Sequence, residues 1–155
     1  MEYGRLIGSL RYITHTRPDL GYSEGVVSRY MASPKESHYK AVKQILRYIK
    51  GMMSYGLFYR KGGNGRLHGY SDCSHGMDLD DRKGTTGMTF YFSGNLITWC
   101  SQKQRTVALS SCEAEFKAAT SAACQALWLR NLLVDLTGWE AQCAIYTWTT
   151  NLPHH

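Results

Sequence analysis

Apolar and polar residues follow two different rhythms along the chain. In the first third, and again between residues 114 and 136, apolar residues recur every three or four positions, as on the buried face of a helix. Between these regions, short apolar and aromatic runs are separated by turn residues, as in strands. The expected helices cover residues 3–12, a segment that starts at 16, about 34–50, and 114–136, and the expected strands cover 67–71, 86–93, 96–100 and 143–147. This order of elements predicts a fold of the α/β class.

Two of the expected helices begin with recognisable capping sequences. Pro18 lies in the first turn of the second helix, where its missing N–H group does no harm. Ser33, Pro34 and Glu36 suit the N-cap, first and third positions of the next helix. Gly51 is expected to end that helix.

The chain between residues 55 and 71 has two interpretations. Residues 55–60 and 67–71 are apolar-aromatic runs joined by the turn sequence Lys61-Gly62-Gly63-Asn64-Gly65, which is typical of a hairpin. The charge also changes here, because residues 1–66 hold twelve basic and four acidic residues (net +8) and the remainder holds six and eight (net −2). The loop is therefore either a hairpin turn or part of a domain boundary.

The helix expected after residue 110 is the most clearly patterned element. Ser110 and Glu113 have the spacing of a capping box, in which hydroxyl and carboxylate each bind an N–H group of the first turn. Glu115 falls on the apolar stripe of this helix. Because an unpaired carboxylate is costly to bury, Glu115 either faces a cation or lies at the edge of the packed face with its head in water. The stripe consists of Ala118, Ala119, Ala122, Ala126, Leu129, Leu133 and Leu136.

Asp72 ends the first strand of the expected sheet and is the candidate partner of Glu115. Taken alone, an Asp at this position is commonly a solvated strand end. A helix laid across an antiparallel sheet can, however, place a carboxylate from its first turns above the central strand. Two carboxylates at one point bind divalent metal ions through hard oxygen ligands. Asp72 and Glu115 are therefore the candidate catalytic and metal-binding residues.

A row of basic residues follows the helix expected at about 34–50, and we call it the basic row. Its members are spaced by three, four and three residues and lie on a different face from the apolar stripe. Such a row suits a phosphate backbone, or is an ordinary solvated helix face. The basic row consists of Lys40, Lys43, Arg47 and Lys50.

Composition narrows the class of protein. The five cysteines are odd in number and form no Cys-x-x-Cys pair, so the sequence signals neither a disulfide framework nor a zinc site. A reducing compartment, cytoplasm or nucleus, is expected. No apolar run has the length of a membrane span, and no membrane partner is expected.

Several motifs resemble the ribonuclease H region of copia-type retrotransposon polyproteins. They are Gly69-Tyr70-Ser71-Asp72, Asp78-Leu79-Asp80-Asp81-Arg82-Lys83, Trp99-Cys100-Ser101-Gln102-Lys103-Gln104 and Val107-Ala108-Leu109-Ser110-Ser111-Cys112-Glu113-Ala114-Glu115. Upstream, residues 6–12, 16–20 and 46–51 resemble the segment that follows the polymerase palm in these polyproteins. The resemblance covers about residues 3–140.

The resemblance implies a ribonuclease H fold, an α+β architecture with a mixed sheet in which three antiparallel strands are extended by parallel ones. It implies a helical thumb- or connection-like segment at 3–52, a ribonuclease H-like domain at 53–148 truncated after the fourth strand, and a tail at 149–155 that fits no family motif. The implied reaction cuts the RNA strand of RNA–DNA hybrids with two Mg²⁺ (or Mn²⁺) ions, and by position Asp72 and Glu115 would be two of their ligands. The implied partners are an RNA–DNA hybrid or other nucleic acid, and the rest of a Pol polyprotein.

The chain departs from the family pattern at acidic positions. Where the family reads Ser-Asp-x-Asp-Trp, this chain has Ser71-Asp72-Cys73-Ser74-His75, and Trp148 stands where an Asp should follow the fourth strand. The third and fourth acidic residues of the site thus have no counterpart, and two carboxylates hold two magnesium ions poorly. We expect a Pol fragment with absent or very weak nuclease activity. The alternatives are a nucleic-acid-binding remnant that uses its basic helices, and a remnant without a function of its own.

Overall fold

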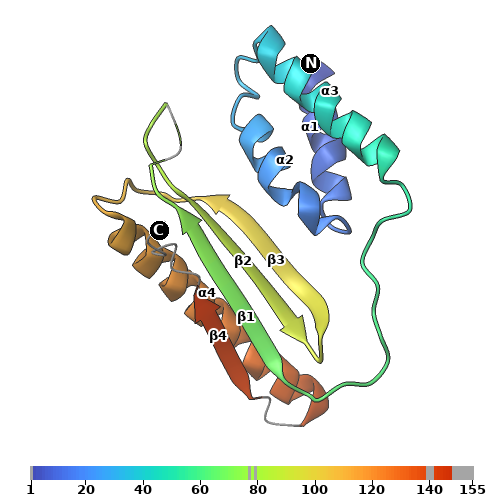
Figure 1. Ribbon diagram of the computed structural model, residues 1–155, viewed down its shortest axis with the longest axis vertical. Helices are drawn as coiled ribbons and strands as arrows, with labels where there is room; N and C mark the ends of the chain where they lie inside the picture. The colour runs from blue at the N-terminus through green and yellow to red at the C-terminus, as the bar shows by residue number, and fades with distance from the viewer. Residues whose placement is uncertain (1, 77, 79, 139–141, 148–155) are drawn as a thin grey trace, which may run out of the picture. The chain divides into compact units, whose positions relative to one another are not determined.

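The structure is a computed structural model that describes residues 2–76, 78, 80–138 and 142–147, the last three of them as backbone only. The residues separate into two units, Met1–Phe58 and Tyr59–His155 (Figure 1). Each unit has a hydrophobic core cluster of its own.

The first unit is helical. It contains α1 (Glu2–Ile13), the 3₁₀ turn η1 (Pro18–Leu20), α2 (Gly21–Ser28) and α3 (Glu36–Gly51). Tyr3, Ile7 and Leu10 recur at helical spacing along α1, and they meet Val27 of α2 and Val42 of α3 in the core. The Tyr3 hydroxyl is buried there and donates to the Val27 carbonyl at 2.8 Å, so its polar atom is satisfied.

The start of α3 differs from the prediction. The helix begins at Glu36, and Lys35, not Ser33, is its N-cap residue. The Lys35 N–H group donates to Nδ1 of His38 at 3.0 Å. This imidazole stacks on the Tyr30 ring at 3.9 Å, so a ring held by packing caps the helix in place of the expected Ser33 hydroxyl. The helix ends at Gly51, as predicted.

Of the two interpretations of residues 55–71, the hairpin is wrong. Residues 52–66 contain neither helix nor strand, and the boundary between the two units falls after Phe58. The first strand already has a partner on each side, which leaves no free edge for residues 55–60. Instead, the Asn95 side chain accepts from the Arg60 N–H group at 2.8 Å and donates to the Arg60 carbonyl at 3.1 Å.

The second unit is a four-stranded sheet with one long helix (Figure 1). Its elements are β1 (Leu67–Ser74), β2 (Thr85–Phe92), β3 (Asn95–Lys103), α4 (Ser111–Thr137) and β4 (Cys143–Thr147). The strand order is β3-β2-β1-β4, with β1–β2 and β2–β3 antiparallel and β1–β4 parallel. The expected α+β architecture, with three antiparallel strands extended by a parallel one, is confirmed.

Helix α4 lies on the sheet through a stripe of small residues. Ala122, Ala126 and Leu129 form one core cluster with Leu67 of β1 and Phe90 of β2. Alanine side chains let the helix backbone approach the sheet closely, and the Phe90 ring fills the remaining space. Among the described residues, no helix combines the length and apolar character that crossing a bilayer requires.

The sequence predicted the N-cap of α4 correctly, but not the partner of Glu113 or the exposure of Leu136. Ser110 Oγ accepts from the Glu113 N–H group at 3.1 Å, as the capping box requires. The Glu113 carboxylate, however, accepts from the N–H group of Leu109 at 2.7 Å, one residue before the cap. The prediction that Leu136 is buried is wrong, since it is 73% exposed and the packing on the core ends one turn earlier, at Leu133.

Candidate functional site

Asp72 lies in β1 opposite Gly87 of β2, and its side chain is exposed. Its Oδ1 accepts from the N–H group of Cys73 at 2.8 Å. Side chains alternate between the two faces of a strand, and Leu67 and Ser71 belong to the buried row that faces α4. Asp72 therefore belongs to the opposite, more exposed row of β1.

Glu115 lies in α4 next to Ala114, which is fully buried, and is itself half-buried. The first turns of α4 thus carry a carboxylate at the rim of the packed helix face. Cys73 lies in the row of β1 that faces the helix, and the charges of both Glu115 and Asp72 act on it. The pKa of the Cys73 thiol is raised, first by burial and then by the negative charges of Glu115 and Asp72.

A glutamine fixes the helix segment that carries Glu115. Gln104 follows β3 and is buried, and its Nε2 donates to Thr86 Oγ1 and to the Ala114 carbonyl, both at 3.1 Å. Its own backbone N–H group donates to the Gly84 carbonyl at 2.8 Å. Gln104 thus ties β2, β3 and α4 together. Sequence reasoning missed this role because a glutamine just past a strand is usually solvated.

The loop before α4 is held by a second set of contacts. Lys117 donates to Glu113 Oε1 at 2.7 Å and to the Val107 carbonyl at 3.3 Å. The pKa of Glu113 is lowered, first by Lys117 and then by the Leu109 N–H group. Glu113 therefore has the structural role that the sequence predicts for it.

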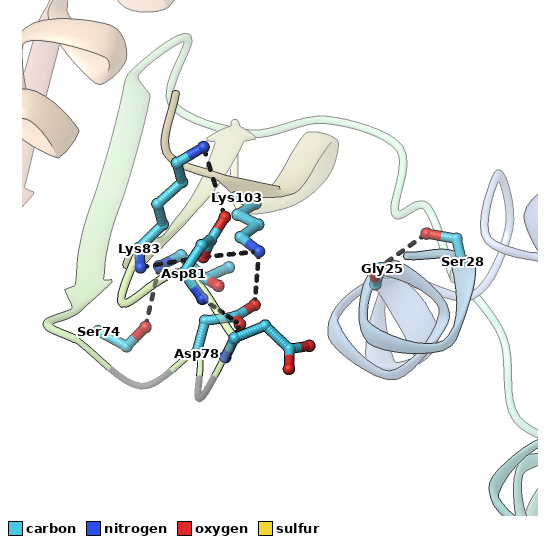
Figure 2. A network of polar contacts seen from close by, with 9 residues as sticks. Gly25, Ser28, Ser74, Asp78, Asp81, Lys83 and Lys103 are labelled. Atoms are coloured by element: carbon cyan, nitrogen blue, oxygen red, sulfur yellow. Dashed lines mark hydrogen bonds and ion pairs between the residues drawn. The ribbon is translucent and has the colours of Figure 1, made fainter. Parts of the chain in front are cut away.

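The loop between β1 and β2 is anchored to β3 by charged side chains (Figure 2). Lys103 Nζ lies 2.6 Å from Asp78 Oδ2 and 2.9 Å from Asp81 Oδ1, and Lys83 pairs with Asp81 at 3.4 Å. Asp78 is only 8% exposed and also accepts from the N–H groups of Asp80 and Asp81. Lys103 and these N–H groups lower the pKa of Asp78 to about 2. This acidic motif is a structural anchor.

An open cavity of about 580 Å³ lies beside the Gln104 tie, between the sheet and the first half of α4. Its walls include Arg105, Phe116 and Thr120, together with Lys103 and Lys117, whose ammonium groups are already paired. Neither Asp72 nor Glu115 lines this cavity. The cavity and the predicted carboxylate site are thus separate features.

The two-metal centre that the resemblance implies needs more ligands than Asp72 and Glu115 supply. Asp72 is exposed, Glu115 is half-buried, and they belong to different elements. Across the described part of the chain, no three His, Cys, Asp or Glu side chains gather closely enough to hold a metal ion. The position of the missing third ligand, Trp148, lies outside the described residues. Since Mg²⁺ demands near-octahedral oxygen coordination, these two carboxylates do not fit a two-ion centre.

The basic row lies along the outer face of α3. All four side chains are exposed. Lys40 pairs with Glu36 at 2.9 Å, in an exposed contact between neighbouring helical turns. Within the described residues, the other three, Lys43, Arg47 and Lys50, have no acidic partner.

The chain is similar to segments of transposon polyproteins. It is 39% identical over 135 residues to the retrovirus-related Pol polyprotein from transposon RE2 of Arabidopsis thaliana, which covers 87% of this chain and 9% of that protein. It is 41% identical over 147 residues to the retrovirus-related Pol polyprotein from transposon TNT 1-94 of Nicotiana tabacum, which covers 94% of this chain and 11% of that protein. The chain thus spans about a tenth of the length of these polyproteins.

A third relative is much shorter. The chain is 40% identical over 130 residues to the secreted RxLR effector protein 161 of Plasmopara viticola, covering 83% of this chain and 92% of that protein. No protein-family profile and no solved structure matches the chain. In the Plasmopara protein, the segment similar to this chain makes up nearly the whole polypeptide.

Proposed function

The chain belongs to the family of copia-type retrotransposon Pol polyproteins, and we propose that it binds nucleic acid as a ribonuclease H-like segment whose hydrolytic activity is absent or very weak. The observation that carries the proposal is the exposed basic row on α3, with three cations that have no acidic partner among the described residues. The ligand we propose is an RNA–DNA hybrid.

The geometry of the row suits a phosphate backbone. Lys40 and Lys50 are ten residues apart on one helix, which corresponds to about 15 Å at the rise of an α-helix. One strand of a duplex carries a phosphate roughly every 3.4 Å along the axis, so the row spans about four phosphates. The Lys40–Glu36 pair is no obstacle, because exposed ion pairs of this kind are weak.

The acidic residues support binding more than hydrolysis. Asp72 and Glu115 are the two acids that match the family motif, and a two-ion centre needs more fixed oxygen ligands than they supply. Without a complete ligand set, we propose no reaction step.

Binding is tested with a fluorescently labelled RNA–DNA hybrid, by anisotropy over a range of salt concentrations. The double variant Lys43→Gln, Arg47→Gln should weaken binding at least tenfold and lower the slope of log affinity against log salt by about 2, one per lost phosphate contact. Arg5→Gln, Lys35→Gln removes the same charge from exposed positions outside the row and is the matched control. Equal losses in the two double variants, or no binding by the unaltered chain at low salt, would overturn the proposal.

Hydrolysis is tested with the same hybrid, labelled on its RNA strand, in Mg²⁺ or Mn²⁺. We expect no robust cleavage by the unaltered chain. Robust cleavage that disappears in Glu115→Gln, but persists in the exposed-acid control Asp135→Asn, would show that the two carboxylates suffice for catalysis and that this part of the proposal is wrong.

A further inference from the structure

We propose that the groove between α2 and α3 binds an unpaired base of single-stranded nucleic acid, with Tyr48 as the stacking surface and the basic row holding the adjoining phosphates. The inference rests on the proposed nucleic-acid binding and adds a second contact to it. It concerns the first unit alone.

The groove has a volume and a lining that suit a base. Its volume is about 560 Å³, and it is lined by Val26 from α2 and by Ala41 and Ile45 from α3. Tyr22, 54% exposed, stands on the α2 side, and Tyr48, 43% exposed, stands on the α3 side. Flat aromatic rings beside an apolar floor are the usual surface on which proteins stack unpaired bases.

Tyr48 is held in place although it is exposed. Its hydroxyl donates to Asp19 Oδ2 at 3.0 Å, and the Arg17 guanidinium carbon lies 5.8 Å from the ring centroid. Arg17 in turn donates to both Asp19 carboxylate oxygens, at 2.9 and 2.7 Å, and to the Met52 carbonyl at 3.0 Å. A ring that is already fixed loses little conformational entropy when a ligand stacks on it.

The acid in the groove does not repel a phosphate strongly. Asp19 also lines the groove, but the buried Arg17 neutralises it through a two-pronged hydrogen bond. The Arg17 hydrogen bond, with help from the Tyr48 hydroxyl, lowers the pKa of Asp19. The pair therefore stays intact at neutral pH and acts as a neutral support for Tyr48.

The basic row adjoins the groove along the helix surface. Gln44 lines the groove, and it lies four residues after Lys40 and three before Arg47. Side chains at these spacings are neighbours on a helix, and Tyr48 is the next neighbour of Gln44 on the same face. A strand whose phosphates contact Lys40 and Arg47 would thus pass Gln44 and present its base to Tyr48.

The proposal selects single strands over duplexes. In the interior of a duplex, both faces of each base are covered by the neighbouring base pairs, so only the two terminal pairs expose a face to a tyrosine. A row of cations alone does not distinguish single strands from duplexes, because it binds the phosphates of either. Preference for unpaired bases is therefore the property that separates the groove from the basic row.

The test compares three labelled ligands: a single-stranded oligonucleotide, the same oligonucleotide with abasic sites, and a blunt RNA–DNA hybrid. Tyr48→Leu should bind the single strand about tenfold more weakly and leave blunt-hybrid binding unchanged. Tyr48→Phe keeps the ring and should keep most of the affinity. Tyr12→Leu, at a 79% exposed tyrosine on α1, is the matched control and should change nothing. The abasic strand should bind the unaltered chain as weakly as the intact strand binds Tyr48→Leu.

Several outcomes would overturn the inference. Equal effects of Tyr48→Leu and Tyr12→Leu would do so, as would a loss in Tyr48→Leu that is the same for all three ligands, which indicates a purely structural role. Normal hybrid binding that depends on Lys43 and Arg47, without any effect of Tyr48→Leu, would leave the proposed function standing and reject the groove. No binding of any ligand at low salt would reject both. Circular dichroism of each variant shows whether the helices remain folded.

Discussion

Gln104 donates a hydrogen bond to the Ala114 carbonyl at 3.1 Å and so joins the end of β3 to the first turns of α4. The same amide group reaches Thr86, and its Oε1 atom is buried without a donor among the described residues. One buried side chain therefore helps to hold the helix start, which carries Glu115, against the sheet.

Gln104→Met should loosen the start of α4. The substitution keeps the length of the side chain but removes both donated bonds, and we expect a loss of about 1 kcal/mol in the free energy of unfolding. Amide hydrogen exchange should accelerate in the first turns of α4, around Ala114. Gln102→Met, at an exposed position of β3, is the control. Unchanged exchange at Ala114 would mean that the capping box alone holds the helix start.

Glu115→Gln should make the Cys73 thiol more reactive. Burial raises the pKa of this thiol most, and the charges of Glu115 and Asp72 raise it further. Removing one charge lowers the pKa and enlarges the thiolate fraction, so alkylation at pH 8 should accelerate about two- to fivefold. Mass spectrometry after brief alkylation separates Cys73 from the exposed Cys112 and Cys124.

Asp72→Asn should act on Cys73 in the same direction. The control, Asp135→Asn, removes an exposed charge from the distant end of α4. If neither Glu115→Gln nor Asp72→Asn changes the rate relative to this control, the two carboxylates do not converge on the thiol.

Low pH should weaken the ion pairs that hold the loop between β1 and β2. The pKa of Asp78 is 3.8 for an unpaired carboxyl group and about 2 beside Lys103. A carboxyl group whose pKa falls on folding stabilises the fold above its unfolded pKa, and this contribution disappears as the pH falls from about 4 towards 2. Asp78→Asn should cost about 1 kcal/mol at pH 7 and flatten the pH dependence of stability in that range. Equal acid sensitivity of variant and parent would contradict the assignment.

Gly69→Ala should strain the core of the second unit. A Cβ atom at Gly69 would lie 2.5 Å from the ring of Phe90, which is fully buried. Overpacking of this kind costs about 1 to 3 kcal/mol, which a urea titration measures. Gly87→Ala is the control in the neighbouring strand, since its nearest atom outside the chain neighbours is 4.0 Å from the new methyl group. A similar midpoint for both variants would show that Phe90 can move aside.

The positions of strands and helices were predicted correctly where residues close in the sequence determine them. β4 covers residues 143–147 as expected, and α4 begins at the Ser110 cap. The predictions failed where another contact competed: the nearby His38 imidazole caps α3 in place of Ser33, and the strands on both sides of β1 left residues 55–60 without a partner. Local propensity contains no information about such competition.

The sequence proposes residues for the candidate site but says little about their surroundings. Asp72 and Glu115 were chosen because their motifs resemble those of ribonuclease H. That they share a metal site stays a prediction. The sequence did not predict the hydrogen bonds of Gln104 or the contact of Tyr48 with Asp19, because the residues that they join lie far apart in the chain. For Arg17 and Asp19, the spacing of two around a proline was the only local hint that their side chains could meet.

The two separate hydrophobic clusters make the chain modular. Between them, residues 52–66 form neither helix nor strand, so no hydrogen-bonded ladder carries cooperativity from one half to the other through the backbone. A substitution that empties the cluster around Phe90 should leave the packing around Val42 intact, because the two clusters share no residue. Substitutions can therefore accumulate in the sheet unit while the helical unit goes on folding.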